Sequence, residues 1–104
     1  MYAIAFDLQQ DILAQTYGSS TYTNAYTDIK KLLTDYGFNR QQGSVYFGDK
    51  NRKIDAVTCV MAVQDLTQRF NWFAPSVKDI RMLRIEEDND LMPAIEKISA
   101  FCKH

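Results

Sequence analysis

The first eight residues alternate between large apolar side chains and small or acidic ones, which predicts a β-strand. One face of this strand is large enough to bury helices, and the other allows a second surface to approach closely. The rigid end of a core strand is a common position for a catalytic group. The alternative for the carboxylate there is that it caps the following turn. The large residues are Tyr2, Ile4, Phe6 and Leu8, and the others are Ala3, Ala5 and Asp7.

Residues 22–36 show the clearest helical pattern, because apolar side chains recur every three or four positions. Before them, Ile12, Leu13 and Tyr17 are compatible with a short helical turn. Gly37 stands where a glycine in the left-handed conformation ends a helix. The apolar stripe consists of Tyr22, Ala25, Tyr26, Ile29, Leu32, Leu33 and Tyr36.

The middle of the chain predicts two short strands and a second long helix. Residues 38–47 are β-like at both ends and polar in the middle. The Gly43-Ser44 pair is typical of a tight turn between two antiparallel strands, or of a bulge in one bent strand. Residues 48–51 close this element and offer capping side chains. The helix from about Arg52 to Phe70 is apolar around most of its circumference, which predicts burial on more than one side.

The last third predicts a loop, a strand and a helix. Residues 71–75 form an aromatic loop whose final proline opposes a helix. Residues 77–87 read as a long strand, and their imperfect alternation indicates a bulge near Met82-Leu83 or apolar cover on both faces. Residues 88–90 offer caps to a last helix. The apolar face of that helix is formed by Leu91, Ile95, Ile98 and Cys102.

The order strand, helix, strand, strand, helix, strand is that of a ferredoxin-like α+β fold, followed here by a C-terminal helix. We expect an antiparallel sheet with both core helices on one face, in a single domain over residues 1–104. The other sheet face carries Ala3, Ala5 and Asp7. This face is either exposed to water or covered by a partner. This open face predicts a homodimer.

Composition narrows the choice of function. The 12 basic and 13 acidic residues give a net charge of −1, so nucleic acid would have to bind through a local basic patch. Cys59 and Cys102 form no CxxC pair, and His104 is the only histidine, which argues against a zinc site and favours buried free thiols. No stretch resembles a membrane span or a signal peptide, so we expect a soluble, cytoplasmic protein.

Four stretches resemble the virulence-associated protein D (VapD) family: MYAIAFDL at residues 1–8, AYTDI at 25–29, YGFNRQQGSVY at 36–46 and SVKDIRMLRIE at 76–86. The family is in turn similar to the small CRISPR-associated adaptation nuclease, a ferredoxin-like dimer. The resemblance implies an endoribonuclease, and some members act as toxins paired with a small antitoxin. The chain departs from the family at its end, where AIEKISAFCKH at residues 94–104 is longer than usual.

A candidate site for RNA cleavage lies where the first and last strands meet the 41–46 segment. Asp7 is the candidate base, or a ligand of a divalent metal ion such as Mg²⁺. Ser44 is a candidate donor to a phosphate oxygen, with Asp79 as a further catalytic carboxylate. The candidates for substrate binding are Arg40 and Arg81 for charge, Tyr46 and Trp72 for stacking on a base, and Gln42 as a helper.

Each candidate has a structural alternative. Ser44 follows Gly43 as turn residues do, and Asp79, next to Lys78 and Arg81, can belong to a cross-strand ion pair. Trp72 can instead close the end of the core. Taken together, these alternatives describe a non-catalytic ferredoxin-like protein that binds nucleic acid or another protein through the same sheet.

Overall fold

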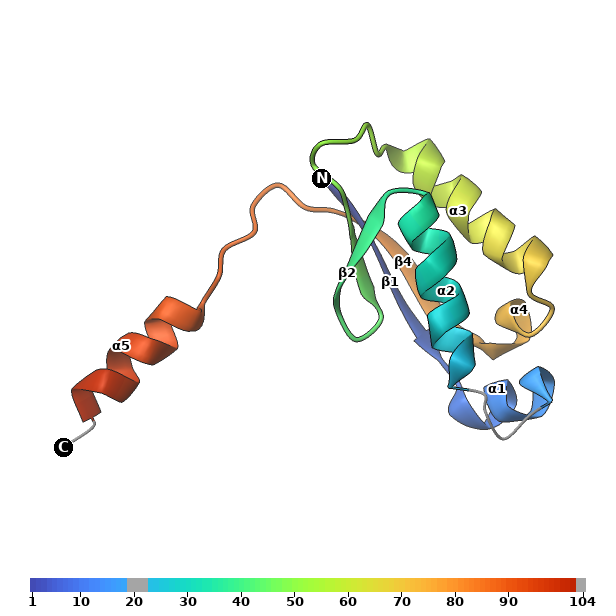
Figure 1. Cartoon of the computed structure of the whole chain (residues 1–104), viewed down its shortest axis with the longest axis horizontal. Coiled ribbons are helices and arrows are strands. Elements are labelled where there is room, and N and C mark those ends of the chain that lie inside the picture. The colour runs from blue at the N-terminus through green and yellow to red at the C-terminus, as the bar shows by residue number, and fades with distance from the viewer. Residues whose placement is uncertain (19–22, 103–104) are drawn as a thin grey trace.

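The computed structural model describes residues 1–18 and 23–102 (Figure 1). Residues 19–22, and with them the predicted stripe residue Tyr22, lie outside the described part, as do residues 103–104. The elements in chain order are β1 (Tyr2–Leu8), α1 (Gln10–Tyr17), α2 (Asn24–Asp35), β2 (Phe38–Gln42), β3 (Val45–Gly48), α3 (Ala56–Arg69), α4 (Phe73–Ser76), β4 (Val77–Arg84) and α5 (Met92–Cys102).

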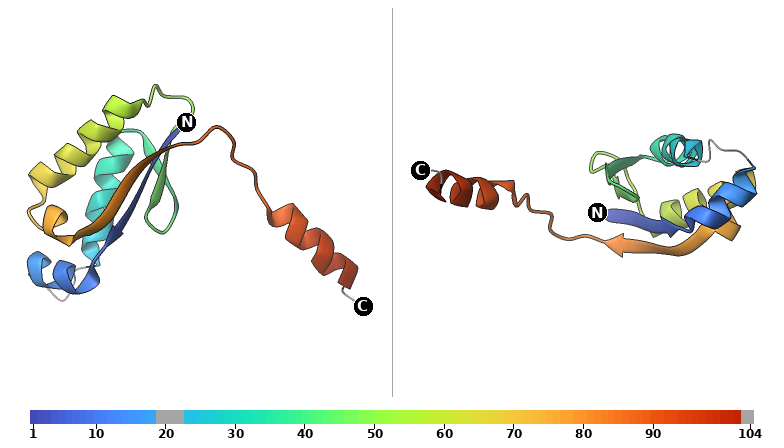
Figure 2. Two further views of the ribbon diagram at one scale, coloured as in Figure 1. Left: turned by 180° about the vertical axis from the view of Figure 1, so that it is seen from behind. Right: turned by 90° about the horizontal axis from the view of Figure 1, so that it is seen from below.

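The four strands form one antiparallel sheet in the order β2-β3-β1-β4. The core lies between this sheet and α2 and α3, because Ile4 and Phe6 of β1 pack with Ile29 of α2 and Leu66 of α3. From behind, β4 and β1 lie in front of α2 (Figure 2). This arrangement confirms the ferredoxin-like α+β fold with its core helices on one face of the sheet.

The predicted first helix is confirmed as α2, and its apolar stripe faces the core. Ala25, Ile29, Leu32 and Leu33 are buried. The helix ends at Asp35, and Gly37, just after the C-cap residue Tyr36, takes the left-handed conformation with φ +99°. Its amide donates a hydrogen bond to the Thr34 carbonyl oxygen at 3.0 Å.

Replacing Gly37 with alanine is expected to destabilise the fold by about 2 kcal/mol or more. A Cβ atom there would lie 2.7 Å from Cδ1 of Ile54, and the left-handed backbone would be strained as well. Gly18 is the matched control, because its φ is +73° but a Cβ would meet nothing within 4 Å. Urea denaturation of both variants tests this, and equal losses would show that the contact with Ile54 does not matter.

The second predicted helix, α3, differs from the prediction in the residue at which it begins and in how many of its sides are buried. α3 begins at Ala56 rather than Arg52, because the carboxylate of Asp55 caps it by accepting from the Thr58 backbone N–H at 2.9 Å. The predicted burial on several sides is wrong, since Val57, Val60 and Met61 are 64%, 51% and 52% exposed. Only one side of α3 faces the core, through Cys59, Ala62 and Leu66.

Two expectations for residues 71–87 also need correction. The predicted loop contains a helical turn, α4, in which Pro75 is tolerated because the amides of a first turn need no helical partner. β4 ends at Arg84, and its irregularity faces Asp7 and Leu8 of β1 rather than lying near Met82-Leu83. Apolar cover on both faces is wrong too, because Met82 and Leu83 of this edge strand are both exposed.

The last helix is confirmed, but it extends away from the rest of the chain (Figure 1). The Asp90 carboxylate caps it by accepting from the Met92 amide at 2.9 Å. Its apolar face is exposed, at 71% for Leu91, 58% for Ile95 and 63% for Ile98. The radius of gyration is 16.8 Å, against about 13 Å for a compact chain of this length, because of this arm.

Candidate functional site

The carboxylates of Asp7 and Asp79 belong to directly opposed residues of β1 and β4. Asp7 shares a face with Ala3 and Ala5, which is the sheet face without core helices. Side chains opposed across antiparallel strands have Cβ atoms about 5 Å apart, so the two side chains leave the sheet from neighbouring points. The structure thus brings two of the three predicted catalytic residues to one point on the open face.

Asp79 also forms an ion pair, as one alternative predicted, but with its neighbour on the same strand. The Nε of Arg81 lies 3.0 Å from Oδ2 of Asp79, and the two side chains are 71% and 53% exposed. Exposed pairs of this kind contribute about 0–1 kcal/mol to stability. Arg81 is therefore weakly held and remains accessible to an anion at the Asp7–Asp79 end of the sheet.

Ser44 lies in the turn between β2 and β3, which confirms the predicted hairpin. Its carbonyl oxygen accepts from the Phe6 backbone N–H at 3.1 Å, so the turn abuts β1 one residue before Asp7. Arg40 steadies the turn, because its Nε donates to the Gly43 carbonyl oxygen at 2.8 Å. Ser44 and Asp7 therefore lie at the same end of the sheet.

A cleft of about 400 Å³ opens between α2 and this hairpin. It brings together Arg40, Ser44 and Tyr46 of the predicted site. The sequence pattern did not single out the residues that α2 adds. Their spacing could have indicated them, because three residues within about one turn of a helix lie on neighbouring positions of its surface. The helix itself packs on β2. These added residues are Tyr26, Thr27 and Lys30.

The ring of Tyr46 is part of the core, which leaves no free face for stacking on a base. The residue is 3% exposed, and its ring lies 6.0 Å from that of Phe6 with 16° between the planes. Burial raises the pKa of the Tyr46 hydroxyl, although the charge of Arg40 opposes this shift. The hydroxyl group therefore stays protonated at neutral pH and lines the cleft as a potential donor.

Trp72 occupies the end of the core, as the structural alternative expected. Its ring centroid lies 4.9 Å from that of Phe70, 5.5 Å from that of Tyr17 and 6.3 Å from that of Phe73. A base could stack on Trp72 only by displacing one of these rings. Gln42 is exposed beside the irregularity in β2, near the turn but not among the residues that line the cleft.

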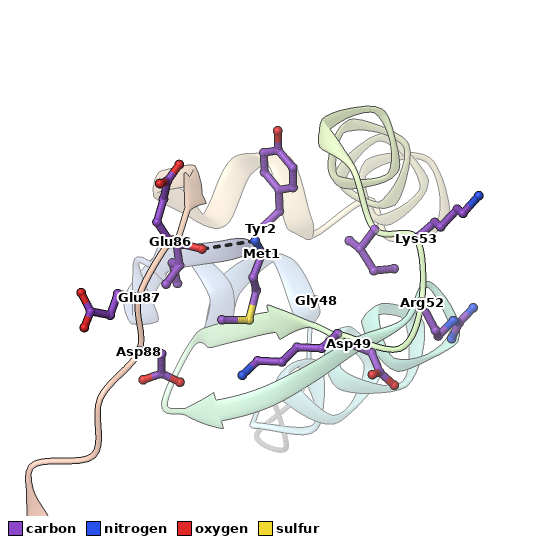
Figure 3. A pocket seen from close by; sticks show the side chains of 12 residues that line it. Met1, Tyr2, Gly48, Asp49, Arg52, Lys53, Glu86, Glu87 and Asp88 are labelled. Atoms are coloured by element: carbon purple, nitrogen blue, oxygen red, sulfur yellow. Dashed lines mark hydrogen bonds between the residues drawn. The ribbon is translucent and has the colours of Figure 1, made fainter.

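A second pocket of about 420 Å³ lies at the other end of β1, beside Met1 and Tyr2 (Figure 3). The Met1 amino group donates to the Ile85 carbonyl oxygen there at 3.2 Å. Its charged lining is mixed, so it offers no uniformly positive surface to an anion. Besides the Met1 amino group, the cations are Lys50, Arg52 and Lys53, and the carboxylates are Asp49, Glu86, Glu87 and Asp88.

Among the side chains that the structure describes, those of residues 1–18 and 23–99, no three histidine, cysteine or acidic side chains form a cluster that could hold a metal ion. Asp7 and Asp79 nevertheless supply two hard oxygen donors from directly opposed residues. Mg²⁺ is commonly held by one or two carboxylates with water completing its shell, so this pair fits such an ion.

The match to known proteins covers most of the chain. The family model described as CRISPR associated protein Cas2 matches residues 1–92. Endoribonuclease VapD 2 of Riemerella anatipestifer is 53% identical over 95 residues, which cover 91% of this chain and 99% of that protein. An endoribonuclease VapD homolog of Helicobacter pylori is 51% identical over 96 residues, covering 92% and 97%.

A more distant relative, endoribonuclease VapD of Dichelobacter nodosus, is 38% identical over 96 residues, covering 92% of this chain and 98% of that protein. The predicted resemblance is thereby confirmed. The fold agrees with it, since the sheet order and helix placement are ferredoxin-like. The chain belongs to the Cas2 family and, within it, to the VapD endoribonucleases.

Proposed function

We propose that this protein is an endoribonuclease that hydrolyses or transesterifies phosphodiester bonds in single-stranded or mRNA-like RNA. The observation that carries the proposal is the convergence of Asp7, Asp79 and the Ser44 turn at one end of the sheet. Relatives that match nearly the whole chain carry the name endoribonuclease VapD, which supports the same activity.

In this proposal Asp7 removes a proton from the attacking oxygen, which is either a ribose 2′-hydroxyl or a water molecule. The new phosphorus–oxygen bond forms as the bond to the leaving oxygen breaks, and the leaving oxygen takes up a proton. Arg81, on the same sheet face as Asp7, supplies positive charge for the phosphorane. Arg40 and Ser44 turn towards α2 and are proposed to contact the RNA on that side of the sheet. Asp79 is the weak ion-pair partner of Arg81 at this end of the sheet.

A divalent cation such as Mg²⁺ is an alternative partner for the two carboxylates. Asp7 and Asp79 would hold it, and it would supply Lewis-acid stabilisation of the phosphate. Their mutual repulsion favours such a cation, since like charges opposed across strands are destabilising.

We also propose that the open sheet face is the interface of a homodimer. Ala3 is 0% exposed and lies between its cross-strand neighbours Phe47 and Leu83. Together with Ala5 these residues give an apolar patch, and Arg81, Asp7 and Asp79 form the charged end of the same face. A twofold axis through this face would bring a second Asp7 towards the first and enlarge a small catalytic set.

The cellular setting is a further part of the proposal. In the part of the chain that the structure describes, no helix is both long and apolar enough to cross a bilayer. Cys59 is a buried free thiol, which is typical of reducing compartments and supports a cytoplasmic location, where mRNA is available. The family resemblance also suggests a toxin with a small antitoxin partner. Co-expression with the neighbouring reading frame would test that role.

Purified protein is expected to cut a labelled single-stranded RNA at internal positions. Parallel reactions with EDTA and with added Mg²⁺ decide whether a metal ion takes part. Loss of cleavage in EDTA that Mg²⁺ restores would assign the carboxylates to a metal site, and undiminished cleavage would assign Asp7 to proton transfer. Failure of a folded protein to cut varied RNAs under both conditions would favour the alternative of a non-catalytic binding protein.

A further inference from the structure

We propose that the cleft between α2 and the β2–β3 hairpin binds a backbone phosphate of the bound RNA other than the one that is cleaved, with Lys30 and Arg40 as its charged ligands. This inference rests on the proposed endoribonuclease function. It assigns a binding role to α2, and in particular to Lys30, which has no role in the reaction described above.

The charge of the cleft points to an anion. Lys30 and Arg40 are the charged residues among the described side chains that line it, and no carboxylate is among them. The pocket at the opposite end of the sheet (Figure 3) sets three cationic side chains and the Met1 amino group against four carboxylates. The nearby Asp28 on α2 accepts a hydrogen bond from Tyr17 at 3.3 Å and does not line the cleft.

The two cations are placed on opposite walls. Lys30 lies one helical turn after Tyr26, on the side of α2 that faces the hairpin. Arg40 is fixed by the hydrogen bond from its Nε to the Gly43 carbonyl oxygen at 2.8 Å, which leaves the other guanidinium N–H groups available. A flexible ammonium and an oriented guanidinium then face the same space, an arrangement suited to phosphate oxygens.

The uncharged lining favours the same ligand. The buried Tyr46 hydroxyl stays protonated because burial raises its pKa, so it can donate to an acceptor oxygen. The Tyr26 hydroxyl already accepts a hydrogen bond from the Gln10 side-chain amide and has its own proton free to donate. Ser44 lines the cleft as well, and its carbonyl oxygen is bonded to Phe6, next to Asp7. A phosphate in the cleft would therefore lie at the same end of the sheet as Asp7, on the side of the sheet that faces α2.

The test measures binding of a single-stranded RNA with 2′-O-methyl groups, in EDTA, to Asp7→Asn protein, so that cleavage cannot interfere. Lys30→Gln and Arg40→Gln are each expected to raise Kd about tenfold, and the double variant about a hundredfold at 0.1 M salt. The slope of log K against log salt should fall in magnitude by about 0.7 in the double variant, which is the value for one single-strand phosphate. Lys31→Gln is the matched control, because Lys31 is exposed on the same helix and does not line the cleft.

Unchanged Kd and salt slope in Lys30→Gln would overturn the inference, as would an equal loss in Lys31→Gln. Lys30 is exposed on α2, so its variant should keep the melting temperature even if Arg40→Gln loosens the hairpin turn. The two proposals can fail separately. Protein that binds RNA through Lys30 but cuts none would retain the phosphate site and refute the nuclease. If the unmodified protein cuts RNA but Lys30→Gln leaves the Kd unchanged, the nuclease would be retained and the phosphate site refuted.

Discussion

Replacing Asp7 with asparagine is expected to reduce RNA cleavage by about a hundredfold or more, because positioned acid–base groups contribute roughly 10²–10⁴ to rate. The amide keeps the size of the side chain but loses its basicity and charge. The melting temperature should stay constant or rise, since the change removes repulsion between carboxylates opposed across β1 and β4. Cleavage rates and thermal melts of the same preparations measure both effects.

Two further variants, Asp7→Ala and Asp35→Asn, show whether the effect on cleavage is specific to the Asp7 carboxylate. If Asp7 is only a turn cap, Asp7→Ala should retain activity and lose about 0.5–2 kcal/mol of stability. Asp35→Asn serves as control, because Asp35 is exposed at the end of α2, away from the open sheet face. Full activity in Asp7→Asn would remove Asp7 from the catalytic residues and with it most of the case for this site.

Replacing Ala5 with arginine is expected to convert the proposed homodimer to monomers at micromolar concentration. Burying an uncompensated charge costs about 3–5 kcal/mol, which corresponds to a rise in Kd of roughly a hundredfold or more. The protomer should still fold, because Ala5 is only partly buried and lies on the sheet face without core helices. Light scattering combined with sedimentation reports the change.

Ala74→Arg is the matched control for this experiment. Ala74 is exposed on α4, so the same charge should be tolerated there without effect on assembly. An unmodified protein that scatters as a monomer would refute the dimer. Dimerisation that persists in Ala5→Arg would place the interface elsewhere.

Most of the fold could be predicted from local sequence patterns, because the tertiary structure keeps the secondary structure that these patterns favour. The alternation in residues 2–8 and the stripe of α2 each have one buried face, and burial is what selects such periodicities. The helix end at Gly37 and the Gly43-Ser44 turn could be predicted because a left-handed backbone favours glycine. The start of α3 was misplaced because several capping residues precede it, and only the fold selects Asp55.

The burial of α3 and β4 could not be read from their composition. Val57, Val60 and Met61 look like core residues, yet they are exposed because the core ends at one side of the helix. The same holds for Met82 and Leu83 on a strand that has only one neighbour in the sheet. An apolar residue is free to remain at the surface, so hydrophobicity alone does not fix which face is covered.

The sequence by itself determined the strand and helix order, the family motifs, and Asp7, Ser44 and Asp79 as candidates. The tertiary structure decided how these candidates are grouped. Strand pairing opposed Asp7 to Asp79 on the open face, whereas the hairpin turned Ser44, Arg40 and Tyr46 towards α2. Lys30 entered the site only through that contact. Periodicity records which side of an element is apolar, but which elements meet depends on contacts between residues far apart in the chain.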